Sequence, residues 1–333
     1  MGNKKTIIFC GLLIFCSASV SALAGKEPVE LKRSDKQIEI LIGGHPFTTY
    51  FYDAKIAKSY FQPLRSAQGT IVTRGYPIGD VVPEEHVHDS SVEPHQRPLY
   101  FAHGNIDGLS FWSEEVFLKR FYNSEEQPFG HMVFTKLDDA SGGADSGSIK
   151  AEFNLVGPMG RILGTETQSF TFSGDENTRT IDCEFVVHAD HGPVVFGDTK
   201  EGTFAIRVAP ELNSPPAHMV SSTGGEGEKQ IWGKRADWVN YDGKVSGEDL
   251  GIAIFDSPKS FRHPTYWHAR AYGLFAANPF GLREFLRDPK QDGSWTVEDG
   301  KSLMFRYRVV IHHGDYKQAG IAEAYQKYAE SEK

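Results

Sequence analysis

Hydrophobic and polar residues alternate along several segments of the chain. Residues 302–311 place an apolar side chain at every odd position, with arginines at two of the positions between them. Shorter runs of the same kind cover residues 153–155, 170–172, 181–185 and 204–208. Successive side chains of a β-strand point to opposite faces of its sheet. The alternation therefore predicts half-buried antiparallel strands.

One segment near the C-terminus has a different period. Ile321, Ala324, Tyr325 and Tyr328 recur at the spacing of an amphipathic α-helix, and Gly320 precedes them. This segment is the one strongly predicted helix of the chain.

The sequence also predicts loops and a second, shorter helix. Gly- and Asp-rich stretches at 138–147, 174–177 and 224–228 predict loops, and residues 281–287 could form a short helix. We predict an all-β fold, a large antiparallel β-sandwich with a C-terminal helix, as a single domain over residues 25–333.

The first 24 residues have the pattern of a secretory signal peptide. Lys4 and Lys5 precede an apolar run at 7–15, and the segment ends in small residues with an Ala-x-Ala site at Ala24. Cleavage there predicts a periplasmic or secreted protein. Two of the three cysteines leave with this segment, so Cys183 remains alone and no internal disulfide is expected.

Charge and hydropathy exclude several classes of protein. The chain has 35 Lys+Arg and 44 Asp+Glu, a net of -9, which becomes 33 − 44 = -11 without residues 1–24. Such an acidic balance argues against nucleic acid as a partner. A mean hydropathy of -0.39 excludes a polytopic membrane protein, and no membrane span is expected after the signal. Nucleophile-elbow, phosphate-loop, dinucleotide and zinc-protease motifs are missing from the sequence.

Four of the 13 histidines fall within 18 residues: His86, His88, His95 and His103. His86 and His88 would share one face of a strand, where two imidazoles can bind one metal, or they could lie in a solvated loop. His95 and His103 flank an apolar run at 98–102, which predicts a buried strand with an imidazole near each end. His95 and His103 are therefore the stronger candidates for proton transfer.

A second group of candidates lies further along the chain. If residues 266–270 are extended, His268 and Arg270 share one face and Trp267 points to the other. An imidazole beside a guanidinium suits an oxygen-rich ligand, although both could be ordinary outward residues of a strand. The other candidate ligand-binding residues are Asp198 before a strand, Trp232 and Trp238 as stacking platforms or core residues, and Asn278 in an Asn-Pro-Phe-Gly motif.

Several ordered motifs together resemble one bacterial family. The sequence Pro-His-Gln-Arg-Pro-Leu-Tyr-Phe-Ala-His-Gly-Asn-Ile-Asp-Gly at 94–108 is similar to the hallmark of a family of unknown function often labelled "methane oxygenase PmoA". Segments 198–209, 232–238, 265–273 and 278–281 resemble its later motifs in the same order. The resemblance covers the chain from about Val29 to Gly314.

This resemblance implies a secreted β-sandwich, similar in architecture to galactose-mutarotase-like sugar enzymes, and it implies carbohydrate as the ligand class. It does not imply a membrane methane oxygenase, because that protein is a bundle of spanning helices. The family commonly has Asp-His-Pro-His-His-Arg where this chain has Val92-Glu93-Pro94-His95-Gln96-Arg97. A metal site that needs the replaced histidines would be impaired, so we expect no tightly bound metal or other cofactor.

The leading hypothesis is an acid/base enzyme of lyase, epimerase or hydrolase type acting on a sugar or sugar acid. Its partner would be a small molecule or oligosaccharide. The candidate catalytic residues are His95, His103 and His268, and the candidate substrate-binding residues are Arg97, Arg270, Glu93, Asp198, Trp232, Trp267 and Asn278. Two alternatives stay open. The first is a non-catalytic glycan-binding module that uses its tryptophans, and the second is a divalent-metal enzyme with His86, His88 and His95 as ligands.

Overall fold

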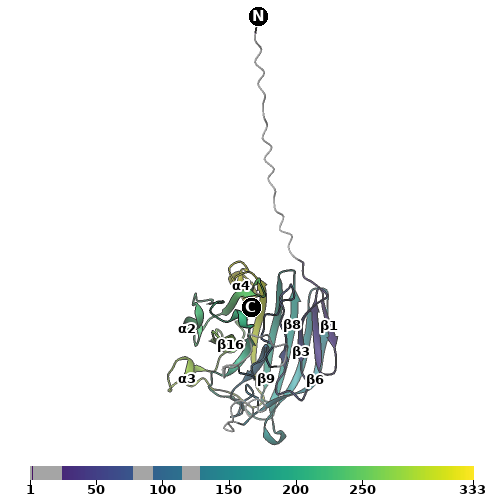
Figure 1. The fold of residues 1–333 in the computed structure, drawn as a ribbon. Coiled ribbons are helices and arrows are strands. Elements are labelled where there is room, and N and C mark those ends of the chain that lie inside the picture. The colour runs from purple at the N-terminus through teal and green to yellow at the C-terminus, as the bar shows by residue number, and fades with distance from the viewer. Residues whose placement is uncertain (1, 3–24, 78–92, 115–127) are drawn as a thin grey trace.

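The computed structural model describes residues 2, 25–77, 93–114 and 128–333, and nearly all of their strands belong to two large sheets (Figure 1). In these residues each of the two sheets has eight strands, and every pair of neighbours is antiparallel. The first sheet has the order β1 (Val29–Arg33), β2 (Gln37–Ile42), β3 (His45–Phe51), β4 (Tyr60–Phe61), β5 (Leu99–His103), β11 (Gly202–Arg207), β16 (Leu274–Asn278) and β15 (Tyr266–Ala269).

The second sheet contains the longest strands. Its order is β12 (His218–Ser221), β13 (Trp238–Val245), β14 (Glu248–Asp256), β18 (Ser302–His313), β9 (Thr178–His188), β8 (Ile162–Gly174), β7 (Gly147–Val156) and β6 (His131–Ser141). A small ribbon of β10 (Val194–Phe196) and β17 (Trp295–Val297) accompanies the two sheets. Within the described ranges, 3₁₀ turns occupy Pro158–Gly160 and Pro210–Leu212.

The two sheets pack face to face through the apolar side chains of the alternating segments. Phe101 of the first sheet stacks on Phe185 of the second at 4.2 Å between ring centroids, and Phe204 stacks on Tyr307 at 4.7 Å. These are the inward positions of the strands, and their burial drives the sandwich together. The predicted all-β sandwich is confirmed.

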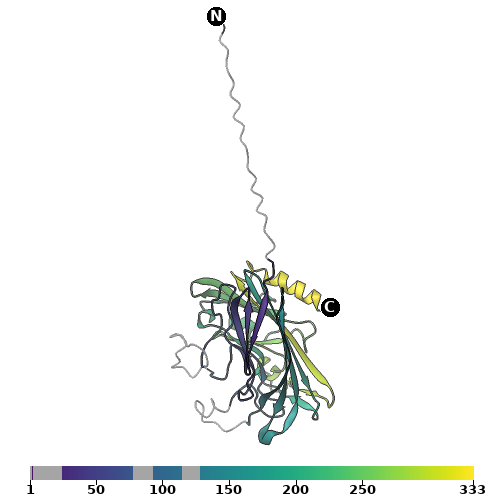
Figure 2. The same cartoon turned by 90° about the vertical axis from the view of Figure 1, so that its right-hand side faces the viewer.

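The predicted C-terminal helix is also confirmed. Helix α4 (Ile321–Ser331) lies against the outer face of the second sheet, at the end of the molecule where the C-terminus is marked (Figure 2). Its residues Ile321, Tyr325 and Tyr328 form a separate apolar cluster with Trp238 and Phe255 of the sheet. The burial of Trp238 under this helix makes it a core residue.

The other helices are short. Helix α2 (Gly227–Ile231) and helix α3 (Leu282–Phe285) lie on the β16 side of the molecule, away from β1 and β6 (Figure 1). The break expected at 138–147 is shorter than the sequence indicated, because β6 continues to Ser141 and the turn begins at Gly142. Within the described part of the chain, no helix has the length and apolar character needed to cross a membrane.

The register of the first sheet decides which side chains share a face. Trp267, Ala277, Phe204 and Phe101 lie side by side on β15, β16, β11 and β5, and they face the core between the sheets. The neighbouring row therefore faces outward, since adjacent residues of a strand point to opposite faces. That outward row consists of His268, Ala276, Ala205 and Tyr100.

Candidate functional site

The outward row of the first sheet lies within a group of buried polar side chains. His268 and Tyr100 stand at its two ends, three strand spacings or about 14 Å apart at the backbone, with two alanines between them. Further polar residues come from the segments directly before β5 and β11, from the end of β11 and from the loop after β15. We call this group the outer cluster; its members are His95, Gln96, Arg97, Tyr100, Glu201, Arg207, His268, Arg270 and Tyr272.

His268 is held in one tautomer. Its Nδ1 atom lies 2.7 Å from the carbonyl oxygen of Lys200, which can only accept, so Nδ1 carries the proton and Nε2 has the lone pair. Nε2 is buried and has no hydrogen-bond partner among the described residues. Burial lowers the pKa of His268, although the carboxylate of Glu201 and the Lys200 carbonyl act in the opposite direction. The result is a neutral imidazole with a free basic nitrogen at neutral pH.

Trp232 and Glu201 lie beside this imidazole. The Trp232 ring meets the His268 ring edge-on at 6.2 Å between centroids, and its Nε1 is buried with no partner in the described chain. The Glu201 carboxylate is close enough to influence the pKa of His268, Tyr100 and Tyr272. Glu201 therefore connects the two ends of the outward row.

Tyr100 supplies a protonated phenol at the opposite end. The residue is 1% exposed, its ring packs 4.9 Å from Trp112, and its hydroxyl has no partner within the described residues. Burial and the nearby Glu201 carboxylate raise the pKa of Tyr100 well above its usual value. The hydroxyl is thus available as a neutral donor.

His95 and Arg97 lie in the segment that leads into β5. Nδ1 of His95 is 3.6 Å from the Glu93 carboxylate, too long for a hydrogen bond, and burial together with the cations of Lys58 and Arg97 lowers the pKa of His95 well below 6.5. Arg97 is bound to the buried carboxylate of Glu114 at 2.5 Å, and Lys58 binds the same carboxylate at 2.9 Å. Burial lowers the pKa of Lys58 to about 8.

Arg270 is also paired within the protein. Its Nε donates to Glu228 at 3.0 Å, and the second oxygen of Glu228 accepts from the backbone nitrogen of Ala271. Its guanidinium lies 5.3 Å from the ring centroid of Tyr272. Arg270 therefore helps to fix the Tyr272 loop at the edge of the outer cluster.

His103 lies on the other face of the same sheet. It follows Phe101 by two residues, so it points into the core, where its ring contacts Phe196 and Phe280. Its Nε2 donates to the Gly197 carbonyl at 2.8 Å, and burial lowers the pKa of His103 to about 4. A Cβ at Gly202 would come within 2.4 Å of its Nδ1. The structure thus separates His103 from His268 and Tyr100 by the thickness of the sheet.

Three predicted substrate-binding residues are bound to the protein itself. Trp267 is fully buried in the core and donates from Nε1 to the Ala236 carbonyl at 2.9 Å. Asn278 donates to the Thr199 carbonyl and accepts from the Phe280 backbone. Asp198 accepts from the backbone nitrogens of Arg283 and Gly293, which fixes the loop around α3. Each of these three side chains therefore holds nearby backbone in place, and none of the bonds described reaches a side chain of the outer cluster.

The metal alternative rests largely on residues outside the described part. His86 and His88 lie in the segment 78–92, outside the described residues, and His95 is the one member of that set within them. In the described ranges, no group of three or more His, Cys, Asp or Glu side chains is arranged to hold a metal ion.

Several members of the outer cluster are hard to find from the sequence. Tyr100 reads as one more apolar residue of a buried strand, and Gln96 stands out only as a departure from a family motif. Arg207 lies within the alternating run 204–208, as an ordinary outward residue of a strand. The sequence signal that could have found Arg207 and Tyr100 is their strand parity, which places both opposite to the phenylalanines of β11 and β5.

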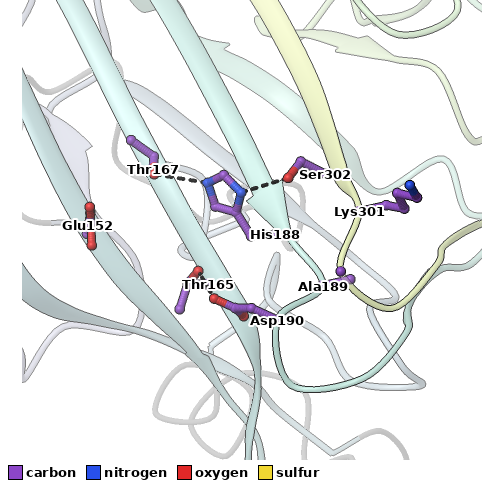
Figure 3. Close-up of a pocket in the computed structure, with 9 residues that line it drawn as sticks. Glu152, Thr165, Thr167, His188, Ala189, Asp190, Lys301 and Ser302 are labelled. Carbon is purple, nitrogen blue, oxygen red and sulfur yellow. Dashed lines mark hydrogen bonds between the residues drawn. The ribbon is translucent and has the colours of Figure 1, made fainter.

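A separate concavity lies on the outer face of the second sheet (Figure 3). It has a volume of about 240 Å³, and His188 stands in it between the hydroxyls of Thr167 at 3.2 Å and Ser302 at 2.8 Å. Asp190 accepts from Thr165 at 2.7 Å. None of the residues predicted from the sequence lines this concavity, and its polar side chains are half-buried or exposed.

Comparison with known proteins identifies the family. A family of unknown function (DUF6807) matches residues 37–326. The chain belongs to this family. The description of this family names no activity. It also does not contain the methane oxygenase label of the family that the sequence motifs resemble. A search of curated proteins found no match to the sequence.

Solved structures of low similarity match most of the chain. They include a putative aldose 1-epimerase from Klebsiella pneumoniae (11% identity, TM-score 0.40, 92% of this chain and 88% of that one) and a galactose mutarotase-like protein from Clostridium acetobutylicum (10%, 0.36, 86% and 99%). An α-galactosidase from Lactobacillus brevis matches at 8% identity and TM-score 0.40. That match covers 87% of this chain, which spans 40% of the length of the galactosidase. Likenesses this distant transfer no activity.

Proposed function

We propose that the protein is an exported acid/base enzyme that acts on a sugar or sugar acid bound at the outer cluster. The export signal belongs to residues 1–24, which lie outside the described residues, and it remains a prediction. The proposal rests on the chemistry of the cluster, because a fold alone hosts many functions.

One observation carries the proposal. Several buried polar atoms in or beside the outer cluster have no hydrogen-bond partner among the described residues. They include His268 Nε2, Tyr100 Oη, Gln96 Oε1 and, beside the cluster, Trp232 Nε1. A buried polar atom without a partner costs free energy, so natural proteins rarely keep several in one region unless something else binds them. A ligand with many hydroxyl groups supplies both donors and acceptors for such a set.

The arrangement favours imidazole chemistry over a pair of carboxylates. Glu114 and Glu228 are each bound to a cation of the protein, and Glu93 faces His95. His268 Nε2 is a buried basic atom of the outward row with no partner among the described residues. In the proposed reaction His268 Nε2 takes a proton from a carbon next to a carbonyl group and then returns a proton to the ligand or releases it to water. Tyr100 donates a hydrogen bond to an oxygen of the ligand and keeps its proton. His95 lies at the Tyr100 end as a second neutral imidazole, while His103 supports β5 from the core.

Exchange of a carbon-bound hydrogen of the sugar for deuterium tests this proposal, whichever product the reaction forms. The protein is incubated in D₂O with a panel of uronic acids, neutral sugars and polysaccharides, and proton NMR follows the loss of each C–H signal and the growth of new signals. The wild type is expected to exchange or convert at least one sugar. His268→Asn should slow that reaction by about 10²–10⁴-fold, the usual contribution of a positioned base.

His188→Asn is the matched control, because it changes a histidine in the concavity of the second sheet and leaves the outer cluster intact. An unchanged rate in His268→Asn would contradict the proposal. Binding without exchange or product formation across the whole panel would favour the glycan-binding module instead. Elemental analysis of protein purified without a metal-affinity tag tests the metal-dependent alternative separately.

A further inference from the structure

Arg207 carries a buried positive charge without a carboxylate partner. The residue is 7% exposed, and no carboxylate of the described residues lies within ion-pair distance of its guanidinium. Nη1 donates to the Tyr272 carbonyl, and Nε is buried with no partner in the described chain. Burial lowers the pKa of Arg207 to about 10, which still leaves it charged at neutral pH. The Glu93 carboxylate acts on the pKa of Arg207 in the opposite direction without forming an ion pair with it. A buried charge without an ion-pair partner is costly, so its retention calls for an explanation.

Several other buried or half-buried arginines are paired with a carboxylate, whereas half-buried Arg262 donates to backbone carbonyls of Pro279, Gly293 and Ser294. Arg97 is bound to Glu114, Arg270 to Glu228, and Arg308 forms a two-point contact with Asp182. Arg179, 2% exposed, lies 3.0 Å from Glu27. Arg97 and Arg270, the two arginines predicted to bind substrate, are thus each paired with a carboxylate, and Arg207 has no such pair among the described residues.

The surroundings of Arg207 suit an acidic, hydroxyl-rich ligand. Arg207 follows Ala205 by two residues and shares its outward face, and Ala205 pairs with Tyr100, so Arg207 and Tyr100 are diagonal neighbours. The guanidinium lies 4.7 Å from the ring centroid of Tyr272. Burial raises the pKa of Tyr272, and Gln96 is close enough to its phenol to act on this pKa in the opposite direction. The free hydroxyl of Tyr100 and the free Oε1 of Gln96 therefore stand beside the charge as a donor and an acceptor.

We propose that Arg207 binds the carboxylate of the substrate, and that the substrate is a carboxylated sugar of the uronic or aldonic acid class. This inference rests on the proposed function of the outer cluster. The guanidinium supplies the charge that matches a carboxylate. The Tyr100 hydroxyl donates to a ligand oxygen, and Gln96 Oε1 accepts from a hydroxyl group on a neighbouring carbon.

Isothermal titration calorimetry with matched sugars tests the inference. The probes are D-galacturonate and D-glucuronate, with D-galactose and D-glucose as their neutral counterparts. The wild type should bind at least one uronate about tenfold or more tightly than its neutral counterpart. Arg207→Gln should weaken uronate binding by about a hundredfold, and Arg207→Lys, which keeps the charge but not the planar fork, by about tenfold. Arg161→Gln, on an exposed turn, should change nothing.

The outcomes separate this inference from the proposed function. Neutral sugars that bind as tightly as uronates, or uronate binding that survives Arg207→Gln, overturn the role of Arg207, even if His268-dependent exchange is seen. Uronate binding that depends on Arg207 without any exchange supports the carboxylate site and counts against catalysis. If Arg207→Gln does not fold by circular dichroism, the comparison of charged with neutral sugars on the wild type and Arg207→Lys still decides the question.

Discussion

Replacing Glu166 by glutamine is expected to flatten the dependence of folding stability on pH. Glu166 lies on β8 and points into the core between the sheets, where it is 0% exposed. Its Oε1 accepts from Gln168 at 2.7 Å, and Gln168 in turn accepts from Tyr50 and Ser59. Its Oε2 has no partner among the described residues. Burial raises the pKa of Glu166 from 4.5 to about 8.

The sign and size of the effect follow from this pKa. Between pH 4.5 and 8 the unfolded chain releases the Glu166 proton and the folded protein keeps it. The stabilisation is therefore complete below pH 4.5 and is lost as the pH rises through about 8. One pKa unit corresponds to about 1.4 kcal/mol, so a difference of 8 − 4.5 = 3.5 units costs at most about 5 kcal/mol in the free energy of unfolding.

Urea unfolding of wild type and Glu166→Gln at pH 5, 6, 7 and 8 measures this effect. The difference between the two free energies of unfolding should move in favour of the variant by about 1 kcal/mol or more per pH unit. Taking the difference removes the contribution of the histidines, whose buried members have lowered pKa values and act with the opposite sign. Glu176→Gln, at an exposed turn, should run parallel to the wild type. Parallel curves for Glu166→Gln would refute the reasoning.

Three further changes probe the packing around the cluster and the helix. Glu114→Gln leaves two buried cations without a full counter-charge and should lower the free energy of unfolding by about 3–5 kcal/mol in urea titration. Gly202→Ala places a Cβ 2.4 Å from His103 Nδ1 and should cost about 1–3 kcal/mol, seen as a lower Tm. Tyr328→Ala removes an aromatic ring from the apolar cluster between α4 and the second sheet, and should lower the free energy of unfolding by about 3–5 kcal/mol in urea titration. A change below about 0.5 kcal/mol in any of them would contradict its assignment.

The sheets and the terminal helix could be predicted from the sequence because burial acts on local periodicity. Residues 302–311 alternate since β18 has one face in the core, and the helical spacing after Gly320 reflects the face of α4 that packs on the second sheet. The extent of β6 could not be predicted in the same way. Two register shifts interrupt its pairing with β7, and most of its last residues are polar, so a regular alternation of apolar and polar residues is absent there.

The candidate site could be predicted only in part, because it depends on register between distant strands. The local alternation correctly gives His268 and Arg270 a common outward side, and Trp267 the opposite one. It also suggests grouping His103 with them, because His103 ends the same strand as Tyr100. Its odd separation from Tyr100 sends it to the core face. The face of the first sheet that becomes the core is the one that packs on the second sheet. The local sequence around each strand does not contain this information.

The pairing of charges explains the remaining difference. Arg97 and Arg270 attract notice because each lies beside a histidine in sequence, but Glu114 and Glu228, which neutralise them, come from other segments. Arg207 has no histidine beside it in the sequence, and no carboxylate within ion-pair distance among the described residues of the fold. Only the three-dimensional arrangement distinguishes an arginine that is paired with a carboxylate from one that is not.

Nitrogen-15 NMR of the histidine side chains, during titration with the uronate that binds most tightly, tests the central claim most directly. Before titration His268 should show a protonated Nδ1 and an unprotonated Nε2 at neutral pH, as its bond to the Lys200 carbonyl requires. The account predicts that the ligand shifts the Nε2 signal of His268 and leaves His188, in the concavity of the second sheet, unchanged. A shift at His188 with none at His268 would contradict it.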